Sequence, residues 1–199
     1  GSCTALGSTL ALTGLSPSTT YFVRVFVTTN PSNQSGKWDF DICVTYTPPP
    51  ANDDCAGATT LTSSTTCSNT AGTLVNATET AGLPAGCVAG THYDVWYKFT
   101  ASQGTHSVTI SSLGSNFANP EIQLYNGTCG SLTSLICGGT TSLSSSSLSI
   151  GNTYYVRVSN VSSAISSNGT FNICVTHPTP PVTVTAGRMK EVFKQTILS

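Results

Sequence analysis

The sequence predicts an all-β protein folded as an antiparallel β-sandwich or jelly roll. Short segments rich in β-branched and aromatic residues recur along the chain, and turn signals separate them. The central region shows no apolar i, i+3, i+4, i+7 stripe of the kind that marks an amphipathic helix. Eight cysteines in 199 residues, none in a C-x-x-C pair, favour a disulfide-bonded fold over structural zinc.

The predicted strands are recognised by residue type and by alternation. Residues 95–99 (Val-Trp-Tyr-Lys-Phe) are β-branched and aromatic, and residues 106–110 (His-Ser-Val-Thr-Ile) alternate polar and apolar with a period of two. Residues 122–125 and 155–158 alternate in the same way. The dipeptides that predict turns are Leu113-Gly114, Asn126-Gly127, Gly138-Gly139 and Asn168-Gly169.

Two parts of the chain repeat each other. Thr20–Val25 (Thr-Tyr-Phe-Val-Arg-Val) parallels Thr153–Val158 (Thr-Tyr-Tyr-Val-Arg-Val), and Phe40–Thr45 parallels Phe171–Thr176. A proline cluster follows each copy. A repeat with a nearly constant offset predicts tandem modules.

The repeat and the prolines suggest a domain organisation. Residues 1–47 match the back half of a module whose complete copy spans 52–177. Because prolines stiffen a chain and cannot donate to a sheet, 48–51 is predicted to be a linker, and 178–199 a second linker with a tail or the start of the next element. The first residues lack the pattern of a signal peptide, so we expect a processed product or a piece of a longer exported protein.

Composition excludes some partners. Charged residues make up 8% of the chain, against about 25% in an average domain, and the net charge is -1. Seven Lys and Arg cannot form a basic face, so we expect no nucleic-acid partner. No apolar run reaches the roughly 18 residues of a transmembrane helix, so we expect no membrane insertion. The cysteines predict a secreted or cell-surface protein.

The surface is expected to consist of hydroxyl-bearing side chains, since the chain holds 28 Ser and 33 Thr. Attached glycans could keep such a weakly charged surface soluble, which makes glycosylation a hypothesis. Five N-x-S/T sequons occur, at Asn33, Asn76, Asn126, Asn160 and Asn168.

Several segments resemble known families. Residues 15–21 fit the L-x-P-x-T-x-Y signature of fibronectin type III-like, immunoglobulin-like sandwiches, and the second copy keeps Leu148 and Tyr154. Residues 52–177 more specifically resemble a repeat of secreted Bacteroidota surface proteins that is related to the bacterial pre-peptidase C-terminal domain. The matching segments are 52–55, 94–99, 124–132, 154–158 and 171–175. The resemblance implies an adhesive or structural tandem module, and it brings no catalytic residues.

A catalytic constellation is not recognisable. The chain has three histidines, His92, His106 and His177. No G-x-S-x-G elbow accompanies them. The carboxylates that could flank a glycosidase cleft are Glu79, Asp94 and Glu121, but nothing in the sequence fixes their spacing. We therefore predict that the chain is not an enzyme.

No cofactor is predicted, and calcium is the one alternative. Calcium needs 6–8 oxygen ligands. The weak candidates are Asp53, Asp54, Asp94 and Glu121. No D-x-D-x-D-G run supplies such a set. The position of Asp53 after Asn52 is also typical of a turn or cap residue.

Disulfide pairing is predicted from the order of the cysteines. We expect Cys129–Cys137 around a short turn, Cys67–Cys87, and Cys55–Cys174 between the first and last strands of the module. By the repeat, Cys43 matches Cys174 and Cys3 matches Cys137, so their partners are expected upstream, outside this chain.

The tail after Pro181 differs from the module because it concentrates basic residues and the only methionine. Its predicted strand and helical face could join copies head to tail, or could begin the next module. The apolar positions of this possible assembly segment are Val182, Val184, Met189, Val192, Phe193 and Ile197.

The leading functional hypothesis is a non-catalytic structural or adhesive module of an extracellular multidomain protein or self-assembling surface filament. Its expected partners are other copies of itself or neighbouring modules, and glycans are a further candidate. The alternative is a carbohydrate-binding accessory module of a secreted enzyme, with Trp96 or Tyr97 as a stacking platform. Because the two face opposite sides of a strand, we expect at most one of them in the core.

Overall fold

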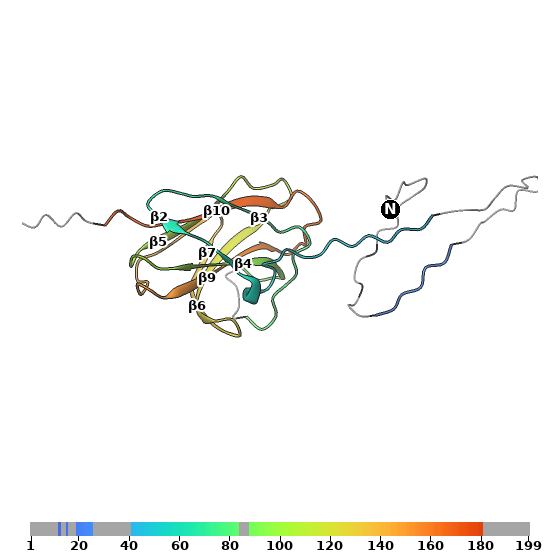
Figure 1. Cartoon of the computed structure of the whole chain (residues 1–199), viewed down its shortest axis with the longest axis horizontal. Coiled ribbons are helices and arrows are strands. Elements are labelled where there is room, and N and C mark those ends of the chain that lie inside the picture. The colour runs from blue at the N-terminus through green and yellow to red at the C-terminus, as the bar shows by residue number, and fades with distance from the viewer. Residues whose placement is uncertain (1–11, 13–14, 16–18, 26–40, 84–87, 181–199) are drawn as a thin grey trace, which may run out of the picture. The chain divides into compact units, whose positions relative to one another are not determined.

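The computed structural model describes residues 12, 15, 19–25, 41–83 and 88–180 (Figure 1). The chain forms two units, residues 1–46 and 47–199. The described residues of the first unit belong to no helix or strand. Cys3, Cys87 and the whole predicted assembly segment lie outside the described residues. That residues 1–47 are the back half of a module stays a prediction.

The second unit is a sandwich of two sheets (Figure 1). The first sheet has the strand order β1-β4-β9-β6-β7. Its strands are β1 (Thr59–Thr60), β4 (His92–Thr100), β9 (Thr153–Val161), β6 (Pro120–Thr128) and β7 (Ser131–Gly139). The second sheet has the order β2-β10-β5-β8, with β3 also paired to β10. Its strands are β2 (Ser63–Ser64), β10 (Thr170–Thr176), β5 (His106–Ser111), β8 (Ser142–Ser145) and β3 (Thr70–Thr73). A short 3-10 helix, η1 (Cys55–Gly57), precedes β1.

The predicted β-sandwich is confirmed, but its sheets are mixed rather than purely antiparallel. β1 runs parallel to β4, and β2 runs parallel to β10. β1 and β2 are separated by two residues in the chain, so one extended segment leaves the edge of the first sheet and joins the edge of the second in the same direction. The other strand pairs are antiparallel. Tandem modules stay a prediction.

The core lies between the facing surfaces of the two sheets. Side chains alternate along each strand, so β4 directs Val95, Tyr97 and Phe99 inward while β10 directs Ile173 and Val175 toward them. The rings of Tyr97 and Phe171 meet edge to face across the core at 6.1 Å.

The four predicted strand cores all lie inside longer observed strands, β4, β5, β6 and β9. Two of the turn predictions were wrong, because Asn126-Gly127 lies within β6 and Gly138-Gly139 within β7. The hairpin turns at Cys129-Gly130 instead. The pairing of β6 with β7 continues in regular register through Asn126 and Gly127, which lie opposite Thr133 and Leu132.

Tyr154 anchors the corner before β9. Its hydroxyl accepts a hydrogen bond of 2.8 Å from the backbone N–H of Ser149, beside the buried Leu148. This is the role that the fibronectin type III-like signature assigns to its tyrosine.

Candidate functional site

The most distinctive chemistry of the second unit lies on the outer face of the first sheet, which points away from the second sheet. Antiparallel sheets usually leave such a face in water. Here β4, β9 and β6 bring polar side chains into register across it: Asp94 is opposite Ser159, and Ser159 is opposite Glu121. We call the buried group His92, Asp94, Glu121, Gln123, Arg157 and Ser159 the outer polar cluster. Each of these residues is at most 5% exposed.

An additional layer of chain covers this face. The backbone of Asn52 accepts a hydrogen bond from Trp96 N–H at 2.7 Å, which holds the entering segment at the edge of β4. The chain then passes through η1, and Cys55 and Ala58 pack with Trp96 and Tyr125 in a small apolar cluster. A second, smaller core therefore lies between the outer face of the first sheet and the segment that covers it.

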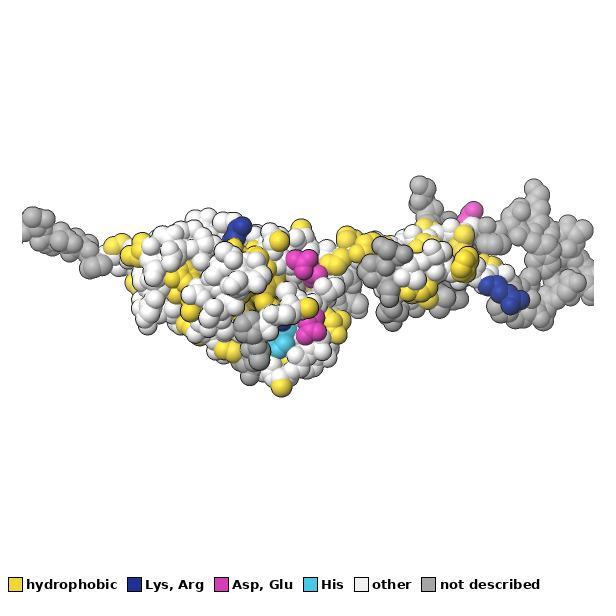
Figure 2. Space-filling model, turned by 90° about the horizontal axis from the view of Figure 1, so that it is seen from below, with side chains coloured by type: hydrophobic (Ala, Val, Ile, Leu, Met, Phe, Trp, Pro, Cys, Tyr) yellow, Lys and Arg dark blue, Asp and Glu magenta, His cyan; other side chains and the backbone are white. Residues whose placement is uncertain are grey.

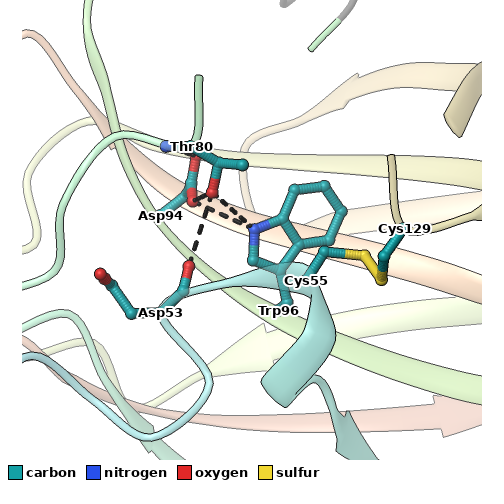
Figure 3. The surroundings of a disulfide bond; sticks show 6 residues. All are labelled: Asp53, Cys55, Thr80, Asp94, Trp96 and Cys129. Carbon is teal, nitrogen blue, oxygen red and sulfur yellow. Dashed lines mark hydrogen bonds between the residues drawn. A yellow bond between two sulfur atoms is a disulfide. The ribbon is translucent and has the colours of Figure 1, made fainter. Parts of the chain in front are cut away.

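A disulfide fixes this covering layer. Cys55 at the start of η1 bonds to Cys129 at the turn after β6, and the bridge lies beside the Trp96 ring (Figure 3). A second disulfide joins Cys67 to Cys174 of β10. Both bridges connect segments that are far apart in sequence, by 74 and 107 residues respectively.

The predicted pairing of these cysteines was wrong. Cys129 lies at the hairpin turn and Cys137 lies opposite Gln123, so most of β7 separates them. At about 3.4 Å per residue, that separation far exceeds the distance that a disulfide can span. Cys55 and Cys174 cannot pair either, because one lies on the outer face of the first sheet and the other in the second sheet.

The predictions for Cys67 and Cys43 were wrong as well. Cys67 bonds to Cys174, so it does not pair with Cys87. Cys43 and Cys137 are disulfide-bonded as well. The bond at Cys43 overturns the inference that its partner lies outside this chain.

An ion pair forms the centre of the outer polar cluster. The Arg157 guanidinium approaches Asp94 Oδ2 through both Nε and Nη2, each at 2.6 Å. The other carboxylate oxygen, Oδ1, accepts hydrogen bonds from Thr80 Oγ1 at 2.6 Å and from Trp96 Nε1 at 3.2 Å (Figure 3). Burial raises the pKa of the Asp94 carboxyl, while the Arg157 charge and the Thr80 hydrogen bonds oppose that rise.

His92 does not form a catalytic triad with its neighbours. Its Nε2 lies 3.0 Å from the carbonyl oxygen of Val88, and its Nδ1 lies 3.3 Å from Ser159 Oγ and 3.8 Å from Glu121 Oε2. A triad histidine presents one nitrogen to the nucleophile and the other to the acid. Here the hydroxyl and the carboxylate share one nitrogen, so the arrangement is that of a structural hydrogen-bond network.

The four weak calcium candidates are engaged separately. The Asp53 carboxylate accepts hydrogen bonds from the Thr78 backbone N–H at 2.7 Å and from its hydroxyl at 2.6 Å, which fits a turn-fixing role. Asp54 is exposed beside η1. Asp94 bonds Arg157, and Glu121 lies near His92. Within the described ranges, no group of three or more His, Cys, Asp or Glu is placed to hold a metal ion. Glu79 is exposed and pairs through its backbone with Tyr93.

The other two histidines meet at the end of the module where the chain leaves β10. The His106 ring is buried, with its centroid 5.2 Å from that of Phe99 and 5.6 Å from that of His177. Burial, and then the nearby His177, lower the pKa of His106.

Trp96 and Tyr97 are both buried, so the expectation that at most one belongs to a core was wrong. Tyr97 faces the core between the sheets, and Trp96 faces the smaller core beneath η1. The additional layer explains the difference, because it buries the strand face that would otherwise be solvated. In the described part of the second unit, no aromatic side chain is among the exposed large hydrophobic residues.

The sequons differ in accessibility. Asn160 is fully buried, where its carbonyl oxygen accepts a hydrogen bond from Asn119 N–H and its amide donates to the Ser163 carbonyl. It therefore has no room for a glycan in the folded chain. Asn126 and Asn168 are exposed, and Asn33 lies outside the described residues.

Sequence reasoning missed Arg157, Gln123 and Ser159 as members of one cluster. The sequence did contain a signal for this cluster, because Arg157 is a single charged residue at the centre of an apolar strand. A charged side chain on a buried strand requires a partner of opposite charge. Asp94 at the start of the aromatic strand was the natural candidate for that partner.

Comparison with known proteins places this fold in a family. Residues 51–173, more than half of the chain, match the model of a family described as galactose binding domain-like and labelled as T9SS-associated. The chain belongs to this family. T9SS is a Bacteroidota system, so the resemblance to repeats of secreted Bacteroidota proteins is confirmed. No curated protein matches the chain.

Among solved structures, the chain is similar to the pre-peptidase C-terminal domain of a collagenase from Bacillus anthracis. The identity is 14% and the TM-score 0.33, over 66% of this chain and 99% of that domain.

Family membership and the disulfides together fit an extracellular accessory module that is secreted. Galactose-binding-like domains are non-catalytic accessory modules. Among the described residues, none of the helical segments has the length and apolar character needed to cross a bilayer.

Proposed function

We propose that the chain is a non-catalytic structural or adhesive module of an extracellular multidomain protein or self-assembling surface filament. The observation that supports this proposal is that the buried ionisable side chains are engaged by partners within the fold. Asp94 is held by Arg157, and His92 is held by a backbone carbonyl and by Ser159. Groups fixed in this way, beneath a disulfide-bonded layer, stabilise the fold and are closed to substrate.

The surface supports the same proposal. On the face seen in Figure 2, charged side chains of the second unit are few. The edge strand β7 exposes Ser131, Thr133 and Leu135, and β8 exposes Ser142 and Ser144. Such hydroxyl-rich, nearly uncharged strands suit contact with other neutral protein surfaces, because little charge has to be desolvated on association.

The test is an activity screen with matched variants. The purified chain is assayed on peptide, ester and glycoside substrates beside Asp94→Asn and Glu121→Gln. We expect background rates for all three proteins. Turnover that survives purification, and that either substitution abolishes in a protein shown by circular dichroism to remain folded, would overturn the non-catalytic proposal. Electron microscopy of the native full-length protein then separates a filament from a module of a long chain.

Carbohydrate binding is the second candidate, and the description of the family as galactose binding domain-like favours it. The shortage of exposed aromatic rings in the described part of the second unit argues against a stacking platform. A glycan array that includes galactosides decides between the two. A specific signal that free galactose displaces would make this the better reading, and its absence would leave the structural role.

A further inference from the structure

A pair of histidines closes one end of the core between the two sheets. His106 is the first residue of β5, and it alternates with the buried Val108, so its ring points into the core. His177 directly follows Thr176 of β10, which pairs with Ser107 in antiparallel register. The next positions along the two strands are therefore His177 and His106, and their ring centroids lie 5.6 Å apart.

This pair holds the chain that leaves β10. The His106 ring, 2% exposed, also lies 5.2 Å from the ring of Phe99, which belongs to the first sheet. The backbone N–H of His177 donates a hydrogen bond of 3.0 Å to the carbonyl oxygen of Ser64, the last residue of β2. Residues 178–180, which follow, are exposed. The contact between the two rings is thus the side-chain contact that keeps the leaving chain on the core.

The elements around His106 offer it no opposite charge among the described residues. Phe99 of β4 contacts its ring, Ser102 Oγ lies 3.4 Å from its Nε2, and Ser145 of β8 is opposite it in register. Lys98, the charged residue next to Phe99, lies on the other face of β4 because side chains alternate along a strand. A proton on His106 is therefore buried without a counter-ion, which is unfavourable.

Two further titratable groups lie at this end of the core in the part of the chain that the structure describes, Tyr154 and His177. The hydroxyl of Tyr154 accepts the hydrogen bond from Ser149, and its ring packs on Phe99. His177 faces His106 directly, so its charge, when protonated, repels a proton there. Burial and then this repulsion lower the pKa of His106, against a smaller opposing effect of a backbone hydrogen bond at residue 103. The packed arrangement of the two rings therefore favours a neutral His106.

We propose that His106 and His177 form a pH switch that releases the chain leaving the second unit when the solution becomes acidic. At neutral pH the two rings pack together and hold His177 on the end of the sandwich. Protons favour an open arrangement, in which both rings are hydrated and apart. The hydrogen bond from His177 to Ser64 breaks in that arrangement, and residues 177–180 become a free joint. This inference goes beyond the proposed function and does not rest on it, since an adhesive and a carbohydrate-binding module could both use such a joint.

The sign and the size of the effect follow from proton linkage. Because the pKa of His106 is lowered in the packed form, the open form binds protons more tightly, and opening becomes more favourable as the pH falls below about 6.5, the ordinary value for histidine. Each proton that is taken up on opening changes the opening equilibrium by at most about tenfold per pH unit. The effect is thus large enough to measure over two pH units.

The test is hydrogen exchange of the backbone amides of the full chain, followed by NMR from about pH 7 to about pH 4.5 and corrected for the intrinsic exchange rate. The His177 amide, which donates to Ser64, should lose its protection by at least about fivefold over this range. The Leu74 amide is the reference, because it donates to Gly169 beside the other end of β10. It should keep its protection.

Matched variants identify the groups that titrate. His106→Gln should abolish the loss of protection, and so should His106→Phe, which keeps a ring against Phe99 and decides the matter if the glutamine variant does not fold. His177→Phe removes the repulsion but not the burial of His106, so it should give a smaller loss than the unsubstituted chain. His92→Gln is the control, because His92 is a buried histidine at the opposite end of β4, and it should show the full loss.

Three results would overturn the proposal. The first is unchanged protection of the His177 amide across the pH range. The second is an equal loss at Leu74, which means that the whole fold opens rather than its end. The third is a full loss in the folded His106 variants, or in His177→Phe, since either result removes one member of the pair from the switch.

Discussion

The Cys55–Cys129 disulfide should contribute both stability and the shielding of Trp96. Replacing both cysteines by serine removes a cross-link between residues 74 apart. In the loop-entropy model, a closed loop of that length lowers the entropy of the unfolded chain by about 15 cal/mol/K, or about 4.5 kcal/mol at 25 °C. We therefore expect the free energy of unfolding to fall by about 2–5 kcal/mol, the range measured for native disulfides.

The second disulfide supplies the control for this prediction. Cys67 and Cys174 are 107 residues apart, so the same model gives about 4.8 kcal/mol for their double serine variant. The two variants should lose similar stability. Only the first should loosen the covering layer, because Cys55 packs on Trp96 and the second bridge lies on the other sheet.

The assay combines urea unfolding with quenching of Trp96 fluorescence by acrylamide under native conditions. It uses a Trp38→Phe background, in which Trp96 is the only tryptophan, and excitation that tyrosine does not absorb. Trp96 is fully buried, so quenching of the parent chain should be weak. We expect a clear rise in quenching for Cys55→Ser/Cys129→Ser and none for Cys67→Ser/Cys174→Ser. A stability loss below about 1 kcal/mol, well under the usual range, or an equal rise in both variants, would refute the reasoning.

Three further predictions concern the cores and the pH dependence. Asp94→Asn leaves the Arg157 charge buried without its counter-ion and should destabilise the fold by about 3–5 kcal/mol in urea unfolding; a loss no larger than that of an exposed ion pair would contradict it. Gly72→Ala places a methyl group against two core aromatic rings, 2.6 Å from Phe171 Cζ, and should lower thermal stability through overpacking of about 1–3 kcal/mol; an unchanged melting temperature would show that the rings yield freely. Because the pKa of His106 is lowered in the folded state, its contribution is complete above about pH 6.5 and is lost as the pH falls toward the lowered value, so His106→Gln should flatten the acid side of the stability profile; an identical slope in both proteins would exclude His106 as its source.

The central strands could be predicted because their alternation is strong and local. Residues 95–99, 106–110, 122–125 and 155–158 each lie within an observed strand, and each strand extends beyond the predicted segment. The extensions contain residues such as His92 and Glu121, which are polar and yet buried. Alternation identifies the two faces of a strand, but it carries no information on whether a loop covers the outer one.

That missing layer also explains why the site was not predicted as a unit. Trp96, Asp94 and Arg157 share the outer face through pairing between β4 and β9, whose residues are about 60 positions apart in the chain. The cover comes from a third segment around Cys55. The disulfide partner of Cys55 is set by this docking and not by the spacing of the cysteines, and docking of irregular chain is a property of the whole fold.

The scarcity of charge gives the outer polar cluster a role in fixing strand register. Sheet register is specified wherever a slip by one residue would move buried side chains to the wrong face. A slip of β9 against β4 would move Arg157 into the apolar core between the sheets and leave Asp94 without its partner, which is far more unfavourable than misplacing an apolar residue. Only 8% of the residues in the chain are charged, so few other charged residues could pair with Arg157 or Asp94 in a shifted register. One buried ion pair can therefore select the alignment of the two central strands.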